Sequence, residues 1–127
     1  MPAPLPDYVT HSVELLSPLG AVRILRMFGG FGLYVDDVFM ALVANEQLYL
    51  KADDTTRGRF EAAGCRPFVY EGGSKTVTMS YWTAPDDALE SPALMLPWAR
   101  LAFEAGLRAR AAKTRTKRPP TRGKSSS

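Results

Sequence analysis

Hydrophobic and polar positions in the first half of the chain follow a pattern of strands and turns. Between Val22 and Lys51, runs rich in Val, Leu, Phe and Tyr are separated by short glycine or polar breaks, which are typical of turns between antiparallel strands. The breaks are Gly29-Gly30, Asp36-Asp37 and Asn45-Glu46. The pattern predicts four strands, over residues 22–28, 31–36, 38–44 and 47–51. Because the third run has no polar residue, we expect it at the centre of the sheet.

Apolar residues at helical spacing predict one helix before these strands and another after them. The first is expected over about residues 8–16, with Asp7 as its N-cap. The second is expected to be capped by Asp53 or Asp54 and to run to about Ala63, with Gly64 as its C-terminal stop, because glycine commonly follows the last helical turn. The inward-facing residues of the two helices are expected to be Val9, Val13, Leu16 and Phe60.

The second half of the chain predicts a hairpin and a third helix. The two strands of the hairpin are expected over residues 67–70 and 76–82, joined by a glycine loop. Ser91 is a helix cap, and Pro92 occupies the first helical position, where proline is tolerated. Pro97 either kinks this helix or marks its true start. The expected apolar stripe of the helix consists of Leu94, Trp98, Leu101, Ala102 and Ala105.

Length and composition indicate one domain with a genuine core. The chain has 127 residues, of which 46% are hydrophobic and 10% aromatic, so we expect no second domain. The N-terminus shows no signal-peptide pattern, and no apolar run approaches the roughly 18 residues that cross a bilayer. We therefore expect a cytoplasmic protein that does not bind membranes. The single cysteine, Cys65, excludes an internal disulfide and agrees with a reducing compartment.

The formal charge of +3 is distributed unevenly along the chain. Residues 1–104 carry 13 acidic and 8 basic side chains, whereas residues 105–127 carry 8 basic and no acidic ones. The apolar pattern ends near residue 111, so we expect residues 111–127 to form a disordered basic tail. The tail residues that could bind nucleic acid are Lys113, Arg115, Lys117, Arg118, Arg122 and Lys124.

Few residues suggest catalysis or metal binding. A single histidine, His11, removes the usual catalytic triads, and together with Cys65 it cannot supply a typical zinc site. We expect His11 to be solvated or locally hydrogen-bonded, and Cys65 to be a structural thiol. We therefore predict that the protein is not an enzyme and that it holds neither a cofactor nor a metal.

Three sequence patterns could also be interpreted as functional sites. Gly29-Gly30-Phe31-Gly32 could be a phosphate-binding loop, but such a loop should open a helix, and residues 33–35 have the pattern of a strand. Asp36-Asp37 could be an acid pair, but its position between two strands favours a turn. The third alternative is a small-ligand pocket, although alternating aromatic residues on strands are more often packing. Its lining would be Tyr34, Tyr49, Tyr81 and Trp82.

Five ordered blocks of sequence resemble one known family. The first block is Arg26-Met27-Phe28-Gly29-Gly30-Phe31-Gly32-Leu33-Tyr34. The others are Leu48-Tyr49-Leu50-Lys51, Phe60-Glu61-Ala62-Ala63-Gly64 followed by Pro67-Phe68, Met79-Ser80-Tyr81, and Leu96-Pro97-Trp98-Ala99-Arg100. Over residues 7–110 the chain is similar to the TfoX N-terminal domain of TfoX/Sxy-type proteins, which are named for regulators of natural competence.

The resemblance implies a fold. Together with the element order α-β-β-β-β-α-β-β-α, it implies an α+β two-layer sandwich similar to secretion-chaperone domains. The antiparallel sheet is expected to have five to six strands, with the helices on one side. Members of the family resemble cytoplasmic bacterial regulators, and the longer ones carry a second, helical domain. This chain has a basic tail in its place.

The leading hypothesis is a non-catalytic regulatory or adaptor domain that binds a protein partner, with nonspecific attraction of the tail to nucleic acid. Secretion-chaperone-like domains commonly pair, so the resemblance also implies a homodimer. The alternatives are direct nucleic-acid binding through the tail and small-ligand binding. Sequence-specific reading of DNA is disfavoured, because the folded part shows no basic recognition helix.

Overall fold

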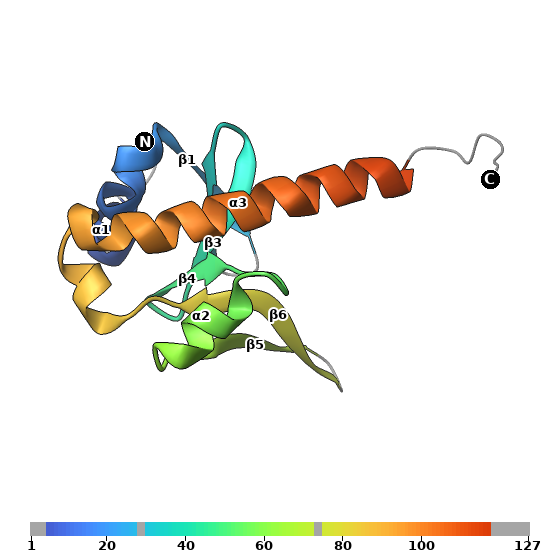
Figure 1. The fold of residues 1–127 in the computed structure, drawn as a ribbon. Coiled ribbons are helices and arrows are strands. Elements are labelled where there is room, and N and C mark those ends of the chain that lie inside the picture. The colour runs from blue at the N-terminus through green and yellow to red at the C-terminus, as the bar shows by residue number, and fades with distance from the viewer. Residues whose placement is uncertain (1–4, 28–29, 73–74, 118–127) are drawn as a thin grey trace, which may run out of the picture.

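The computed structural model of the chain describes residues 5–27, 30–72 and 75–117. Its six strands form one antiparallel sheet with the order β1-β2-β3-β4-β6-β5 (Figure 1). The strands are β1 Val22–Met27, β2 Gly30–Val35, β3 Val38–Ala44, β4 Gln47–Lys51, β5 Pro67–Gly72 and β6 Lys75–Thr83. The α-helices are α1 Asp7–Leu16, α2 Arg57–Ala62 and α3 Pro92–Lys117, and 3-10 helices cover Ser17–Leu19 and Asp86–Glu90. The predicted α+β class and the predicted order of elements are confirmed.

The helices and the sheet share one main hydrophobic core. Alternate side chains of each strand face the helices, because the side-chain period of a strand is two residues. Leu33, Met40 and Leu50 contribute from three adjacent strands and are fully buried. Helix α3 crosses β3 and β4, and α1 packs against α3 (Figure 1). Each large side chain buried here stabilises the fold by about 1.5–3 kcal/mol, so this layer is the main source of stability.

The residues of α3 that face the core differ in part from the predicted apolar stripe. Its fully buried residues are Met95, Ala99, Ala102 and Ala105. Ala102 and Ala105 confirm the prediction, whereas the prediction for Leu94 is wrong, because that side chain is 50% exposed. Small inward residues let the helix pack closely on the sheet, which favours alanine over leucine at the contact. Trp98 is the expected anchor, with its ring 5.2 Å from that of Phe60 in α2.

Two tight turns connect β2 to β3 and β3 to β4. Asp36 and Asp37 have φ angles of 51° and 61°, and Asn45 and Glu46 have φ angles of 53° and 61°. Two consecutive residues with positive φ are typical of a type I′ turn, whose twist matches that of paired strands. The prediction that Asp36-Asp37 forms a turn is confirmed. The other predicted glycine loop includes residues 73–74, which lie outside the described residues.

The glycine-rich segment after β1 begins a strand. Gly30 pairs with Met27 across the β1–β2 ladder, so the segment opens a strand where a phosphate-binding loop would need a helix. A Cβ atom at Gly30 would collide with the carbonyl oxygen of Val43 in β3, and this close approach requires glycine. The hairpin turn was expected at Gly29-Gly30, but Gly30 belongs to β2. Phe28 and Gly29 lie outside the described residues.

The predicted start of α3 and the predicted end of α2 are confirmed, whereas the predicted N-cap of α1 is wrong. The Leu94 amide donates to Ser91 Oγ at 3.1 Å, as expected for the start of α3. Asp7 is the first residue of α1 and not its N-cap, which is Pro6 and makes no side-chain hydrogen bond. A carboxylate in the first turn still interacts favourably with the positive end of the helix dipole, so Asp7 keeps a role at this end. After α2, Gly64 has a φ of 81°, as expected for a helix stop.

Helix α3 is longer than predicted. The sequence predicts disorder from residue 111, but the helix continues to Lys117, so the expected domain boundary lies inside a continuous helix. Gly106 is buried, and a Cβ atom there would lie 2.6 Å from Val38 Cγ1 and 2.9 Å from the Phe39 carbonyl oxygen. Residues 107–112 are exposed, and the helix projects beyond the sheet (Figure 1). Residues 118–127 lie outside the described part of the chain.

Candidate functional site

A second, smaller cluster of apolar side chains lies on the other face of the sheet. Tyr34 and Phe39 pair across the β2–β3 ladder, on the face opposite to Leu33 and Met40 of the main core. The cluster that they join is built from strand residues. We refer to its rings as the aromatic face, which consists of Tyr34, Phe39, Tyr49, Phe68 and Tyr81.

The rings of the aromatic face form two groups, and the rings within each group are in contact. Tyr34 stacks on Phe39 with ring centroids 5.0 Å apart and an interplanar angle of 18°, and Phe39 contacts Tyr81 at 5.5 Å. Tyr49 meets Phe68 edge-on at 4.8 Å. Aromatic pairs at such distances add about 0.5–1.5 kcal/mol each beyond the burial of their area. The first group therefore forms a continuous surface of rings from β2 to β6.

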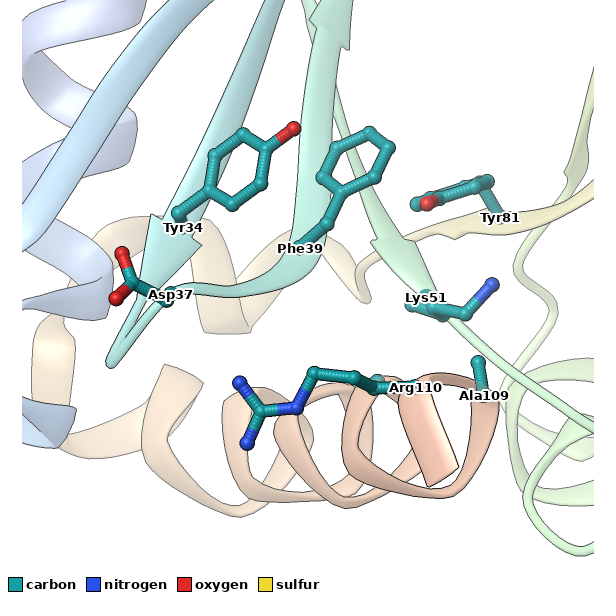
Figure 2. A pocket seen from close by; sticks show the side chains of 8 residues that line it. Tyr34, Asp37, Phe39, Lys51, Tyr81, Ala109 and Arg110 are labelled. Atoms are coloured by element: carbon teal, nitrogen blue, oxygen red, sulfur yellow. The ribbon is translucent and has the colours of Figure 1, made fainter. Parts of the chain in front are cut away.

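A cavity of about 320 Å³ lies where the aromatic face meets α3. Its aromatic residues are Tyr34, Phe39 and Tyr81. Helix α3 contributes the small residues Gly106 and Ala109. Figure 2 shows the remaining lining side chains, which are Asp37, Lys51 and Arg110. Because β2, β3, β4, β6 and α3 all contribute, the fold assembles this cavity from segments far apart in the sequence.

The charged side chains of the lining are two cations and one carboxylate. Lys51 Nζ lies 4.8 Å from the centroid of the Tyr81 ring, within the range of cation–π attraction. Arg110 extends from α3 toward the turn between β2 and β3 (Figure 2). Asp37 Oδ1 accepts a hydrogen bond from Arg23 Nη2 at 3.1 Å, so a cation outside the lining balances this carboxylate. By residue type, the lining therefore has one more cation than carboxylate.

The Tyr81 hydroxyl is held in its neutral form. Burial raises the pKa of Tyr81, and the neighbouring Tyr34 raises it further. The phenol therefore keeps its proton at neutral pH and can donate a hydrogen bond. The Tyr81 side chain is 4% exposed, so packing fixes the position of its ring in the site.

The structure brings together two of the four residues predicted for a small-ligand pocket. Tyr34 and Tyr81 both line the cavity, whereas Tyr49 packs against Phe68. Trp82 lies in the main core, on the opposite face of the sheet. Because Trp82 directly follows Tyr81 in a strand, the two side chains must point to opposite faces. The alternation could therefore have shown from the sequence that Tyr81 and Trp82 do not line the same pocket.

Sequence reasoning missed six of the eight lining residues, and three of these six show why. Phe39 lies in an unbroken apolar run, where no alternation with polar residues shows which face it takes. Lys51 could have been placed from the inward position of Leu50, because neighbouring strand residues alternate between faces. Arg110 reaches the cavity only because of the angle at which α3 crosses the sheet, and no local pattern specifies that angle.

The predicted nucleic-acid-binding residues fall into two sets. The first set belongs to the backbone of α3 and consists of Lys113, Arg115 and Lys117. The second set lies outside the described residues and consists of Arg118, Arg122 and Lys124. The first set therefore belongs to a helix, where the sequence predicts a disordered tail.

The family motif is mainly structural, but it supplies one residue of the cavity. Arg26 lies near the end of β1, with its guanidinium carbon 5.0 Å from the centroid of the Phe31 ring. Gly30 and Gly32 belong to β2, where Gly32 pairs with both neighbouring strands. Tyr34 is the motif residue that lines the cavity.

The two lone groups that could carry chemistry are a hydrogen-bonded histidine and a half-buried thiol. His11 Nε2 lies 2.7 Å from the Leu89 carbonyl oxygen, and since a carbonyl only accepts, the ring nitrogen donates. Burial raises the pKa of the Cys65 thiol, although a hydrogen bond with Thr83 lowers it, so the reactive thiolate is disfavoured. Among the described residues, no three His, Cys, Asp or Glu side chains are grouped as metal ligands. None of the helices described is long and apolar enough to cross a membrane.

An ion pair between Arg108 and Asp53 connects α3 to the loop before α2. Arg108 Nε and Nη2 donate to the two carboxylate oxygens of Asp53 at 2.6 and 3.1 Å. Asp53 Oδ1 also accepts from the amides of Thr55 and Thr56, at 3.1 and 3.2 Å. The Arg108 hydrogen bond, above all, lowers the pKa of Asp53 from its ordinary value. Asp53 therefore stabilises the turn before α2, but the prediction that it or Asp54 caps the helix is wrong. The N-cap of α2 is Thr56, which makes no side-chain cap hydrogen bond, and the helix begins at Arg57.

The chain matches the model of one protein family and is similar to several known proteins. The family model described as the TfoX N-terminal domain matches residues 14–106. DNA transformation protein TfoX1 of Aliivibrio fischeri is 30% identical over 91 residues, which are 72% of this chain and 44% of that protein. Protein Sxy of Escherichia coli is 23% identical over 100 residues, which are 79% and 48% of the two chains. An uncharacterized 12.7 kDa protein in the trpE 5′ region of Spirochaeta aurantia is 31% identical over 86 residues, 68% and 70% of the two chains.

The match covers most of the cavity lining, but Ala109 and Arg110 lie beyond the matched residues. Residues 14–106 include the whole sheet, α2 and the part of α3 that packs on the sheet. The chain spans about half the length of TfoX1 and of Sxy. The resemblance noted in the sequence is confirmed, and this chain belongs to the TfoX N-terminal domain family.

Proposed function

We propose that this chain is a competence-related regulatory or adaptor domain that acts by binding and not by catalysis. It contacts a protein partner, and the cationic end of α3 adds nonspecific attraction to nucleic acid. The observation that carries the proposal is the projection of a basic helix from an acidic body.

The charge along α3 changes where the helix leaves the sheet. Residues 107–117 extend the helix by about 16 Å, at roughly 1.5 Å per residue. This segment contains five basic residues, which are Arg108, Arg110, Lys113, Arg115 and Lys117, and no acidic one. Residues 1–106, which precede it, carry more acidic than basic side chains. A basic helix of this kind attracts a polyanion, while the acidic body disfavours a broad contact with the same partner.

The protein-partner part of the proposal is supported by the matched relatives. In TfoX1 and Sxy, the matched region is less than half of the chain, so the domain is joined there to a further protein segment. The name of TfoX1 associates that protein with DNA transformation. We propose that this chain works in the same setting, in contact with another protein or with a second copy of itself.

Salt-dependent binding to duplex DNA tests the role of the helix. If the six predicted tail residues each meet a phosphate, log affinity should fall against log salt with a slope near −5, from roughly 0.9 per contact. Replacing Lys113, Arg115 and Lys117 together by Gln in the full chain should reduce the magnitude of this slope by about 2.7. The affinity and slope are measured by fluorescence anisotropy.

A matched variant removes the same charge from the body. Arg59, Arg66 and Arg100 are exposed and lie away from the projecting end of α3, so replacing all three by Gln should leave most of the slope unchanged. An equal loss of slope in both triple variants would contradict the role of the helix.

Crosslinking in cells followed by mass spectrometry tests the protein partner. The expected result is a defined set of crosslinks from the body of the domain that persists in the helix triple variant. Crosslinks between copies of the chain would identify a homodimer. Protein that stays monomeric and forms no reproducible crosslink would reject this part of the proposal.

A further inference from the structure

We propose that the cavity between the aromatic face and α3 binds a small planar anion, an aromatic ring that carries a carboxylate or a phosphate group. The site lies in the body of the domain and uses the sheet, so the proposal does not depend on the regulatory function proposed above. Its support comes from the size of the cavity, its ring surface and the arrangement of its charges.

The size and shape of the cavity suit a ligand with one or two fused rings. Its volume of about 320 Å³ is close to the lower end of ligand pockets, roughly 300–1,000 Å³. Tyr34, Phe39 and Tyr81 line the cavity with apolar ring surface, against which a planar ligand can pack. On the helix side, Gly106 and Ala109 carry almost no side chain, so α3 approaches this surface without filling the space.

The charges of the lining favour an anion. Lys51 comes from β4 beside Tyr81, and Arg110 comes from α3, so two cations flank the ring surface (Figure 2). Guanidinium groups bind carboxylate and phosphate with paired hydrogen bonds, and an ammonium binds either as a point charge. The carboxylate of Asp37 is balanced by Arg23 at 3.1 Å, so it opposes an incoming anion less than an unpaired carboxylate would.

The same contacts disfavour a cationic ligand. Aromatic surfaces also bind cations, through the negative face of the ring. Here the protein already places a lining cation on one of the rings, with Lys51 Nζ at 4.8 Å from the centroid of Tyr81, while Arg23 over Tyr34 is paired with Asp37. A ligand cation would meet the charge of Lys51 and be repelled, whereas a ligand anion would be attracted by it.

Titration of the isotope-labelled full chain, followed by NMR, tests the proposal. The two anionic probes are 2-naphthoate, for the carboxylate class, and adenosine 5′-monophosphate, for the phosphate class. Their matched controls are naphthalene-2-carboxamidine, which is planar and cationic, and adenosine, which lacks the phosphate. We expect at least one anion to shift the amide signals of Phe39, Lys51 and Ala109, and to bind at least tenfold more tightly than its control. The anion that binds more tightly identifies the class.

Two alanines on the exposed side of α3 provide matched variants. Ala109 lines the cavity, whereas Ala111 lies two residues further along the helix and does not contribute to the lining. Ala109→Leu should fill the mouth of the cavity and weaken binding of the preferred anion at least tenfold. Ala111→Leu adds the same side chain and should change the affinity less than twofold. Circular dichroism checks that both variants keep the fold.

A third variant tests the charge. Lys51→Gln should weaken anion binding at least fivefold and reduce the preference for the anion over its matched control. The proposal is overturned if neither anion shifts the cavity signals at millimolar concentration, or if the amidine binds as tightly as the naphthoate. It is also overturned if Ala109→Leu and Ala111→Leu weaken binding equally.

Discussion

Glu46 holds a backbone conformation that its side chain disfavours. Its φ of 61° lies in the left-handed region, and Asn45 before it has a φ of 53°. A residue with a Cβ atom is less stable there than glycine by roughly 1–2 kcal/mol, because the Cβ atom crowds the neighbouring carbonyl oxygen. The β3–β4 pairing on both sides of the turn holds this conformation in place.

Glu46→Gly should therefore stabilise the protein by about 1 kcal/mol, because glycine adopts positive φ without this crowding. The measurement is the free energy of unfolding from urea denaturation. Glu61→Gly is the matched control, because Glu61 is an exposed residue of α2, and glycine there should destabilise the fold by about 1 kcal/mol. Destabilisation by Glu46→Gly would contradict the turn geometry.

Asp53 is the residue that should give the fold its clearest dependence on acid. The Arg108 hydrogen bond lowers the pKa of Asp53 in the folded protein, so the folded state favours the ionised carboxylate more than the unfolded state does. This stabilisation is present in full above about pH 5 and is lost as the pH falls through the lowered pKa.

Asp53→Asn should destabilise the fold by only about 1 kcal/mol at pH 7, because Arg108 is 44% exposed and solvent screens the pair. The destabilisation should shrink as the pH is lowered toward 2, where the wild-type carboxyl is protonated as well. The measurement is urea unfolding of both proteins across this range. Asp54→Asn is the control, because Asp54 is 94% exposed, and its effect should be small at every pH. A constant difference between wild type and Asp53→Asn would contradict the assignment.

At the scale of elements, α3 combines a packed half with a projecting half. The packed half approaches the sheet through alanines and ends at Gly106, which lies against Val38 and the Phe39 backbone. Close packing of this kind leaves no space for an added methyl group, so the surroundings must shift to accept one. The position of α3, and therefore the floor of the cavity, depends on this contact.

Gly106→Ala should destabilise the protein by about 1–3 kcal/mol, although alanine favours helices, because the new Cβ atom would collide with Val38 and Phe39. Gly58→Ala is the matched substitution in α2, where no atom lies within 4 Å of the added Cβ atom. It should stabilise the fold by up to about 1 kcal/mol through helix propensity alone. The free energies of unfolding of the two variants are compared, and the same sign for both would contradict the packing at Gly106.

At the scale of the whole molecule, stability is distributed unevenly along α3. Residues 107–112 are exposed, so they bury less area than residues 99–105, although Arg108 pairs with Asp53 and Arg110 donates to the Asp36 carbonyl oxygen. A helical segment with little burial is less stable in water than a packed one, because the cost of nucleation is offset less.

Hydrogen exchange should reveal this gradient. Amides of residues 109–112 should exchange about 100-fold or more faster than those of residues 99–105, which lie under the sheet. The rates are measured by NMR on the full chain at neutral pH. Uniform protection along α3 would show that a partner or a second copy of the chain covers the projecting half in solution.

Much of the fold was predictable because its determinants are local. The polar breaks at Asp36-Asp37 and Asn45-Glu46 lie between apolar runs, so the turns could be placed from neighbouring residues alone. The cap at Ser91 follows from a polar residue placed just before a proline. The stripe on α3 was misplaced at Leu94, because apolar residues at helical spacing surround the helix and only the sheet selects among them.

The candidate site was less predictable than the fold. Tyr34 and Tyr81 could be proposed as aromatic strand residues, but the sequence does not show that they line the same cavity as Lys51 and Arg110. Residues that are distant in the chain become neighbours only after the sheet order and the helix crossing are fixed. Their proximity depends on long-range packing, which local periodicity does not describe.

By itself, the sequence determined the strands, the turns, the order of elements and the uneven distribution of charge, because these depend on side-chain period, backbone preference and composition. The tertiary structure alone decided which face of α3 is buried, how far the helix continues past residue 111, and that a cavity forms at the aromatic face. The physical reason is that burial is a property of pairs of elements. A side chain is covered only when another element lies across it, and the position of α3 over the sheet is set by the whole core.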